Sequence, residues 1–156
     1  MKILLQEFMQ NAAVTSIVEG KSQLGNLSLS EEALLLAAAY RKKPQSMFII
    51  KNNAYTAQKL YDRLECLLED DVLLFSVEES LRVEAIAASP ESKAAQMETM
   101  AKLLDKHPYI CVMNAAAAIR FQPSVDIFQQ HFIHIRQDDV LDYEQLKQLL
   151  FEAGYA

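Results

Sequence analysis

From about residue 31 onward, the apolar residues alternate between the spacing of helices and that of buried strands. Glu31 to Lys43 is rich in Leu and Ala and stops before Pro44, which predicts a helix. Three short continuous apolar runs are typical of buried parallel strands. They are MFII (Met47 to Ile50), VLLF (Val72 to Phe75) and YICVM (Tyr109 to Met113).

Two helical segments separate these runs. In Tyr55 to Leu68, one helical face is apolar and consists of Ala57, Leu60, Leu64, Leu67 and Leu68. The second helix begins at Ser89-Pro90, with Ser89 as the N-cap and Pro90 at the first helical position. Its apolar stripe comprises Ala94, Met97, Ala101 and Leu104, so we expect Met97 to pack in the core. Strands separated by such helices predict an α/β fold, with a parallel sheet flanked by helices.

The pattern changes near Gln122-Pro123-Ser124, which divides the chain into a predicted domain over 1–124 and the beginning of a second over 125–156. The second part contains a predicted strand, FIHI (Phe132 to Ile135), a turn at 137–139, and a helix over 142–153 that Gly154 terminates. One strand and one helix cannot close a core. We therefore expect the chain to stop inside the second domain.

Composition and charge narrow the function classes. With 156 residues, 51% of them hydrophobic, the chain can form one domain and part of another. Gln, Glu and Asn interrupt the first 20 residues, and no run approaches the roughly 20 apolar residues of a membrane span. We therefore expect a cytoplasmic protein with no membrane contact. A net charge of −6 argues against a broad nucleic-acid-binding face. The basic cluster Arg41 to Lys43 follows a predicted helix, where cations suit the negative end of the dipole.

Other potentially reactive residues lack the spacing of a catalytic or metal site. Cys66 and Cys111 form neither a disulfide framework nor a zinc motif, and we expect both to be inert packed thiols. His131 and His134 fall on opposite faces of a predicted strand, so no metal site is expected there. The many acids between residues 65 and 98 suit a solvated surface.

One stretch, LGNLSLSEEALLLAAA (Leu24 to Ala39), has the outline of a phosphate-binding loop opening onto a helix. Such a loop requires G-x-x-x-x-G-K-[ST], with a strand before it and a helix after it. Here Gly25 is kept, but Ser30, Glu31 and Glu32 replace the second glycine, the lysine and the hydroxyl residue. Glu31 turns an attraction for phosphate into a repulsion of about 4 kcal/mol for each unit-charge contact at 4 Å.

The same residues also suit a helix start. Ser28 or Ser30 can cap a helix, and Glu31 and Glu32 favour its positive N-terminus. We therefore expect a strand-turn-helix frame that binds no cofactor, although Glu32 could still contact a metal ion.

On longer segments, the chain resembles the N-terminal, UvrB-like region of bacterial transcription-repair coupling factors. The matching segments are NNAYTAQKLYDRLECLL (Asn52 to Leu68), VEAIAASPESKAAQMETMAKLL (Val83 to Leu104), ICVMNAAAAIRFQP (Ile110 to Pro123) and LDYEQLKQLLFEAGY (Leu141 to Tyr155). UvrB itself fits less well. It keeps an intact nucleotide loop, and it has a tyrosine-rich segment where this chain has FSVEESLRVEAIAASPE, which contains no tyrosine.

This resemblance implies a P-loop NTPase-like domain 1a with a degenerate loop, followed by the start of domain 2 from Val125. The intact coupling factor is an ATP-driven, magnesium-dependent translocase on duplex DNA that displaces stalled RNA polymerase and recruits UvrA for nucleotide excision repair. Its motor lies far C-terminal, and its complete second domain contacts UvrA. The resemblance therefore implies that this chain is a noncatalytic scaffold packing on the motor domains, with no catalytic, cofactor or metal residues of its own.

Two other functions remain open. A divergent nucleotide-hydrolysing domain would use Glu32 for magnesium, but it lacks the lysine and an evident strand with paired acids. A small-molecule-binding doubly wound domain is disfavoured because the chain has only 3 glycines, and none of them are grouped as a dinucleotide loop requires.

Overall fold

The structure is a computed structural model that describes residues 2–20, 23–77, 90–130, 140 and 142–152. The chain forms two compact units, Met1–Arg120 and Phe121–Ala156. None of the described helices is both long and apolar enough to cross a membrane.

A parallel sheet forms the centre of the first unit. Its strands are β1 (Met47–Lys51), β2 (Val72–Phe75) and β3 (Ile110–Asn114), in the order β1-β3-β2. Met47 of β1 and Val72 of β2 both lie opposite Ile110 of β3. The predicted strands and the α/β class are therefore confirmed, with β3 beginning one residue later than expected.

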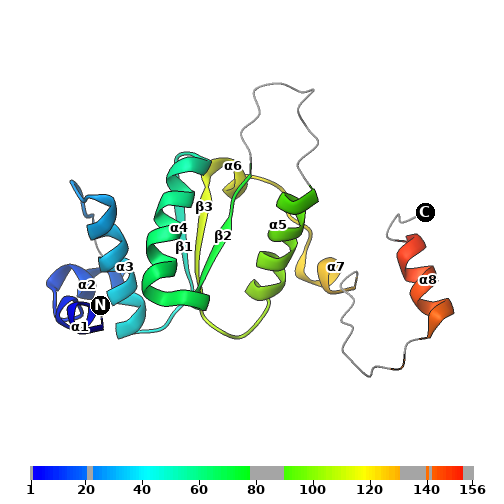
Figure 1. The fold of residues 1–156 in the computed structure, drawn as a ribbon, viewed down its shortest axis with the longest axis horizontal. Helices are drawn as coiled ribbons and strands as arrows, with labels where there is room; N and C mark the ends of the chain where they lie inside the picture. Colours follow the sequence, from blue (N-terminus) through cyan, green and yellow to red (C-terminus); the bar gives the residue numbers. More distant parts are fainter. Residues whose placement is uncertain (1, 21–22, 78–89, 131–139, 141, 153–156) are drawn as a thin grey trace. The chain divides into compact units, whose positions relative to one another are not determined.

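Helices cover both faces of this sheet (Figure 1). On one face lie α3 (Leu29–Lys42) and α4 (Ala54–Leu68), and α1 (Lys2–Phe8) and α2 (Ala12–Val18) pack against α3. On the other face lies α5 (Pro90–Leu103). The 3-10 turn η1 (Glu69–Asp71) precedes β2, and α6 (Ala115–Ala118) follows β3. The largest fully buried side chains include Leu60, Leu64, Leu68, Ile110 and Val112. Burying each one stabilises the fold by roughly 1.5–3 kcal/mol.

The strand β1 differs from the prediction, because it is not buried on both faces. It lies at the edge of the sheet, and the side chains of Phe48 and Ile50 are each 58% exposed. The helix α5 covers this face over β2 and β3, where Met100 and Leu103 pack against Leu73 and Cys111. A continuous apolar run does not reveal whether a strand is central or at an edge, so the expectation of full burial was wrong.

The inward face of α5 also differs from the prediction. Met97 is 54% exposed, whereas Thr99 is buried and its hydroxyl donates to the Leu74 carbonyl oxygen at 3.0 Å. The Gln96 amide donates to the Ser76 carbonyl oxygen, also at 3.0 Å. These bonds to the end of β2 turn polar residues inward, so the apolar stripe expected through Met97 was wrong. Pro90 is the first residue of α5 as predicted, and Ser89 lies outside the described residues.

The second unit contains α7 (Val125–Gln130) and α8 (Tyr143–Glu152). The helix α8 confirms the prediction over 142–153, and α7 was not predicted. The predicted strand at 132–135, the turn at 137–139, His131, His134 and Gly154 lie outside the described residues.

The orientation of α5 predicts different effects for its two central methionines. Met100→Ala should lower the free energy of unfolding by about 2 kcal/mol, because Met100 packs against the sheet. Met97→Ala, the matched control, should change it by less than about 0.5 kcal/mol. Urea unfolding of the whole chain, followed by circular dichroism, measures both values. Equal losses would contradict the observed orientation.

Candidate functional site

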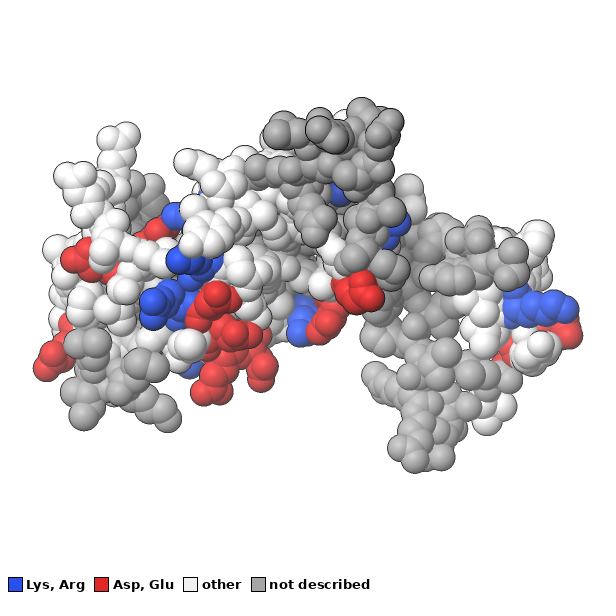
Figure 2. Space-filling view, turned by 45° about the horizontal axis from the view of Figure 1, so that its top comes forward, with Lys and Arg blue, Asp and Glu red and all other residues white. Residues whose placement is uncertain are grey.

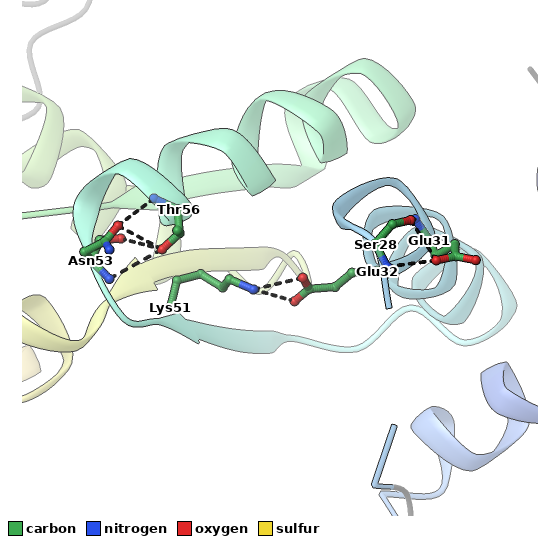
Figure 3. A network of polar contacts seen from close by, with 6 residues as sticks. All are labelled: Ser28, Glu31, Glu32, Lys51, Asn53 and Thr56. Carbon is green, nitrogen blue, oxygen red and sulfur yellow. Dashed lines mark hydrogen bonds and ion pairs between the residues drawn. The ribbon is translucent and has the colours of Figure 1, made fainter. Parts of the chain in front are cut away.

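Ligands of open α/β sheets bind at the carboxyl ends of the strands, so the candidate site lies at this edge of the sheet. Residues from three parts of the chain occupy this edge, and Figure 3 shows those from the start of α3 and from the β1–α4 region. They are Ser28, Glu31 and Glu32 at the start of α3, Lys51 at the end of β1 with Asn53 and Thr56 at the start of α4, and Asn114 at the end of β3.

Ser28 and Glu31 form a reciprocal cap at the start of α3. The Glu31 backbone N–H donates to Ser28 Oγ at 3.3 Å, and the Ser28 backbone N–H donates to Glu31 Oε2 at 2.8 Å. The Ser28 hydroxyl also donates to Glu31 Oε2 at 2.7 Å. The two bonds that the Glu31 carboxylate accepts, first from the Ser28 hydroxyl and then from the Ser28 N–H, lower the pKa of Glu31. Of the two predicted N-caps, Ser28 rather than Ser30 therefore caps α3, and Glu31 completes a capping box with it.

Glu32 forms an ion pair with Lys51, the last residue of β1. Lys51 Nζ lies 2.9 Å from both Glu32 Oε1 and Glu32 Oε2, and both side chains are partly buried. A phosphate-binding loop carries its lysine within the loop, whereas here the lysine comes from a strand and binds a carboxylate. Glu32 would have to give up Lys51 to bind a magnesium ion. Within the described residues, no three acidic, His or Cys side chains are grouped to hold a metal.

The segment around Gly25 lacks the expected frame. In the described part of the chain, the element before α3 is the helix α2, and the first strand comes only after α3. A Cβ built on Gly25 would meet nothing within 4 Å, so no close backbone approach requires a glycine there. The expected strand-turn-helix arrangement was therefore wrong.

The other helices at this edge also begin with side-chain caps. At the start of α4, Asn53 Oδ1 accepts the Thr56 N–H at 2.9 Å. At the end of β3, the fully buried Asn114 accepts the N–H groups of Val77 and Ala117 at 3.1 and 3.3 Å, and its amide donates to the Val77 carbonyl oxygen at 2.8 Å. At the starts of α3, α4 and α6, one first-turn N–H group is therefore engaged by a side-chain oxygen of the chain itself.

Sequence reasoning missed Lys51, Asn53 and Asn114. The three-residue spacing of Asn53 and Thr56 is a capping signal that could have been recognised. The roles of Lys51 and Asn114 depend on partners 19 and 37 residues away, which no local pattern indicates.

The expectations for the basic cluster and the cysteines had mixed outcomes. Arg41 and Lys42 lie in the last turn of α3 as expected, and Lys42 Nζ donates to the Met9 carbonyl oxygen and to Thr15 Oγ1 at 3.1 and 2.8 Å. In the view of Figure 2, the basic and acidic side chains of the described residues lie next to one another. Burial raises the pKa of the Cys111 thiol to about 12. Cys66 is exposed, so the expectation of a packed thiol was wrong for it.

Curated proteins similar to this chain are transcription-repair-coupling factors. The Bacillus subtilis (strain 168) protein is 33% identical over 133 residues, which cover 85% of this chain and 11% of that protein. The protein of Staphylococcus aureus (strain bovine RF122 / ET3-1) is 24% identical over 130 residues, covering 83% of this chain and 11% of its own length. The Staphylococcus haemolyticus protein (strain JCSC1435) is also 24% identical, with the same coverage.

These similarities confirm the resemblance to the N-terminal region of transcription-repair coupling factors. The chain spans about a tenth of the length of these curated relatives, 11% in each case. No protein-family model matches the chain. No solved structure matches it significantly.

The ion pair at the candidate site predicts a measurable coupling between two elements. Glu32→Gln and Lys51→Met, made singly and together, should give a coupling free energy of about 0.5–1 kcal/mol in urea unfolding. The coupling should shrink at 1 M NaCl, because salt screens partly exposed charges. Additive effects of the two substitutions would show that this pair does not link α3 to β1.

Proposed function

We propose that this chain is a noncatalytic scaffold at the N-terminal end of a transcription-repair coupling factor. Its similarity to curated coupling factors over most of its length supports the parentage. The single observation that supports the noncatalytic role is the Glu32–Lys51 ion pair. Glu32 could otherwise bind a metal ion and Lys51 a phosphate, but in this structure the two side chains bind each other. The capped starts of α3 and α4 support the same conclusion.

Within the whole protein, we infer an ATP-dependent translocase that acts on duplex DNA, displaces stalled RNA polymerase and recruits UvrA. The proposed arrangement places a degenerate P-loop NTPase-like domain over 1–124 and the beginning of a second domain over 125–156. The motor would bind ATP and magnesium outside these residues. This chain would support the UvrA-recruiting domain and pack on the motor domains.

A divergent nucleotide-hydrolysing domain is the alternative. It would require Glu32 to exchange Lys51 for a magnesium ion, beside Glu31 and a triphosphate. Each like-charge contact at 4 Å opposes this by about 4 kcal/mol at an effective dielectric of 20. The geometry at the carboxyl edge therefore favours the scaffold.

Nucleotide binding separates the two functions. Isothermal titration of the chain with ATP and magnesium should give no binding heat up to millimolar nucleotide. A control variant with Glu31→Lys and Glu32→Thr, which restores the lysine and hydroxyl of the loop, should also fail to bind, because a helix rather than a strand precedes α3. Micromolar affinity in the unmodified chain that Glu32→Gln abolishes would establish the alternative.

The proposal that UvrA binds only a complete second domain also predicts whether this chain retains UvrA. The immobilised 156-residue chain should not retain UvrA, because the contact is proposed to need a complete second domain. The full-length Bacillus subtilis coupling factor is the positive control. Retention of UvrA by both proteins at similar concentrations would place the contact within this chain and contradict the proposed boundary.

A further inference from the structure

The helices α1 and α2 lie on the outer side of α3, away from the sheet. Figure 1 shows α3 between these two helices and the sheet, and α3 is the main contact of both helices. Leu5 of α1 and Val14 of α2 are buried in the core cluster that also contains residues of α3. We call residues 2–18 the α1–α2 pair, and its place in the first unit depends mainly on α3.

Two contacts hold α3 on the sheet without any contribution from the α1–α2 pair. Near the start of α3, the Glu32 carboxylate pairs with Lys51 of β1 at 2.9 Å. Near its end, the Tyr40 hydroxyl donates to the carbonyl oxygen of Pro108, shortly before β3. Because one contact lies near each end, α3 can stay on the sheet when the α1–α2 pair is displaced.

Lys42 binds the α1–α2 pair from the last turn of α3. Its Nζ donates to the Met9 carbonyl oxygen at 3.1 Å and to Thr15 Oγ1 at 2.8 Å. Met9 directly follows α1 and Thr15 lies within α2, so one ammonium group contacts both parts of the pair. Leu35 and Ala38 are buried and precede Lys42 by seven and four residues, which places them on the same side of α3. This side of α3 therefore faces the α1–α2 pair.

The α1–α2 pair buries few side chains compared with the helices nearer the sheet. From Leu5 onward, its buried residues are Leu5 and Val14, whereas α4 alone buries four residues. Segments with few buried apolar contacts open locally at a lower free energy than the core of the same domain. The hydrogen bonds of Lys42 are also exposed to solvent, so water can replace them at a small net cost.

We propose that the α1–α2 pair is a separable cover of α3 and that Lys42 is its latch. In the open state, the side of α3 that carries Leu35 and Ala38 is free of the pair, while Glu32 and Tyr40 still hold the helix on the sheet. The sheet, α4 and α5 stay folded. One side of α3 is thus covered and uncovered without unfolding of the first unit.

Hydrogen exchange of the 156-residue chain tests whether the pair opens separately. Mass spectrometry follows peptides covering residues 2–20 and 109–114, under conditions where the exchange rate reports the opening equilibrium. The first peptide should be protected at least about tenfold less than the second. Met100→Ala removes a contact on the other face of the sheet, so it should speed exchange of 109–114 about 30-fold. It should leave exchange of 2–20 unchanged within about twofold, because the cover opens without α5. Equal acceleration of both peptides would overturn the proposal, since the pair would then open only with the whole unit.

A second pair of variants tests the latch. Lys42→Met should speed exchange of 2–20 about fivefold, the effect expected for the loss of one hydrogen bond of ordinary net strength. Lys43→Met is the matched control, because it removes the same charge from the next exposed position, and the Lys43 side chain forms no hydrogen bond or ion pair with the described residues. It should leave this exchange unchanged within about twofold. Circular dichroism checks that both variants are folded. Equal exchange of 2–20 in the two variants would contradict the role of Lys42.

Discussion

The burial of β3 on both faces is the constraint on which the rest of the first unit depends. Ile110, Cys111 and Val112 are fully buried, and β3 pairs with a parallel strand on each side. A parallel strand needs a long crossover to reach its neighbour, so each crossover provides a helix to cover one face. The helix α4 covers the face of Ile110 and Val112, and α5 covers that of Cys111.

A buried central strand also has to satisfy its polar groups where it ends, and this requirement shapes the candidate site. Asn114 at the end of β3 bonds to both backbone groups of Val77 and to the first turn of α6. Thr99 and Gln96 bond to carbonyl oxygens near the end of β2. Side chains of the chain itself therefore bond to backbone groups at the carboxyl ends of β2 and β3.

The stretch around Gly25 keeps the first glycine of a phosphate-binding loop, but within the described residues no strand precedes it. Ser28, Glu31 and Glu32 each have a structural partner, and those partners lie in the helix cap and in β1. The ion pair joins α3 to the end of β1 through two partly buried side chains. Of these contacts, the Glu32–Lys51 ion pair ties α3 to the sheet.

The sequence by itself determined the three strands, the helices between them, the parallel α/β class and the capping role near Ser28, because all of these depend on residues close together in the chain. The buried face of α4 followed from spacing alone for the same reason. Only the tertiary structure decided which strand lies at the edge, which face of α5 turns inward, and that Lys51 pairs with Glu32. Each of these depends on long-range neighbours: α5 covers only part of one sheet face, carbonyl oxygens of Leu74 and Ser76 attract Thr99 and Gln96, and the partner of Glu32 lies 19 residues further along the chain.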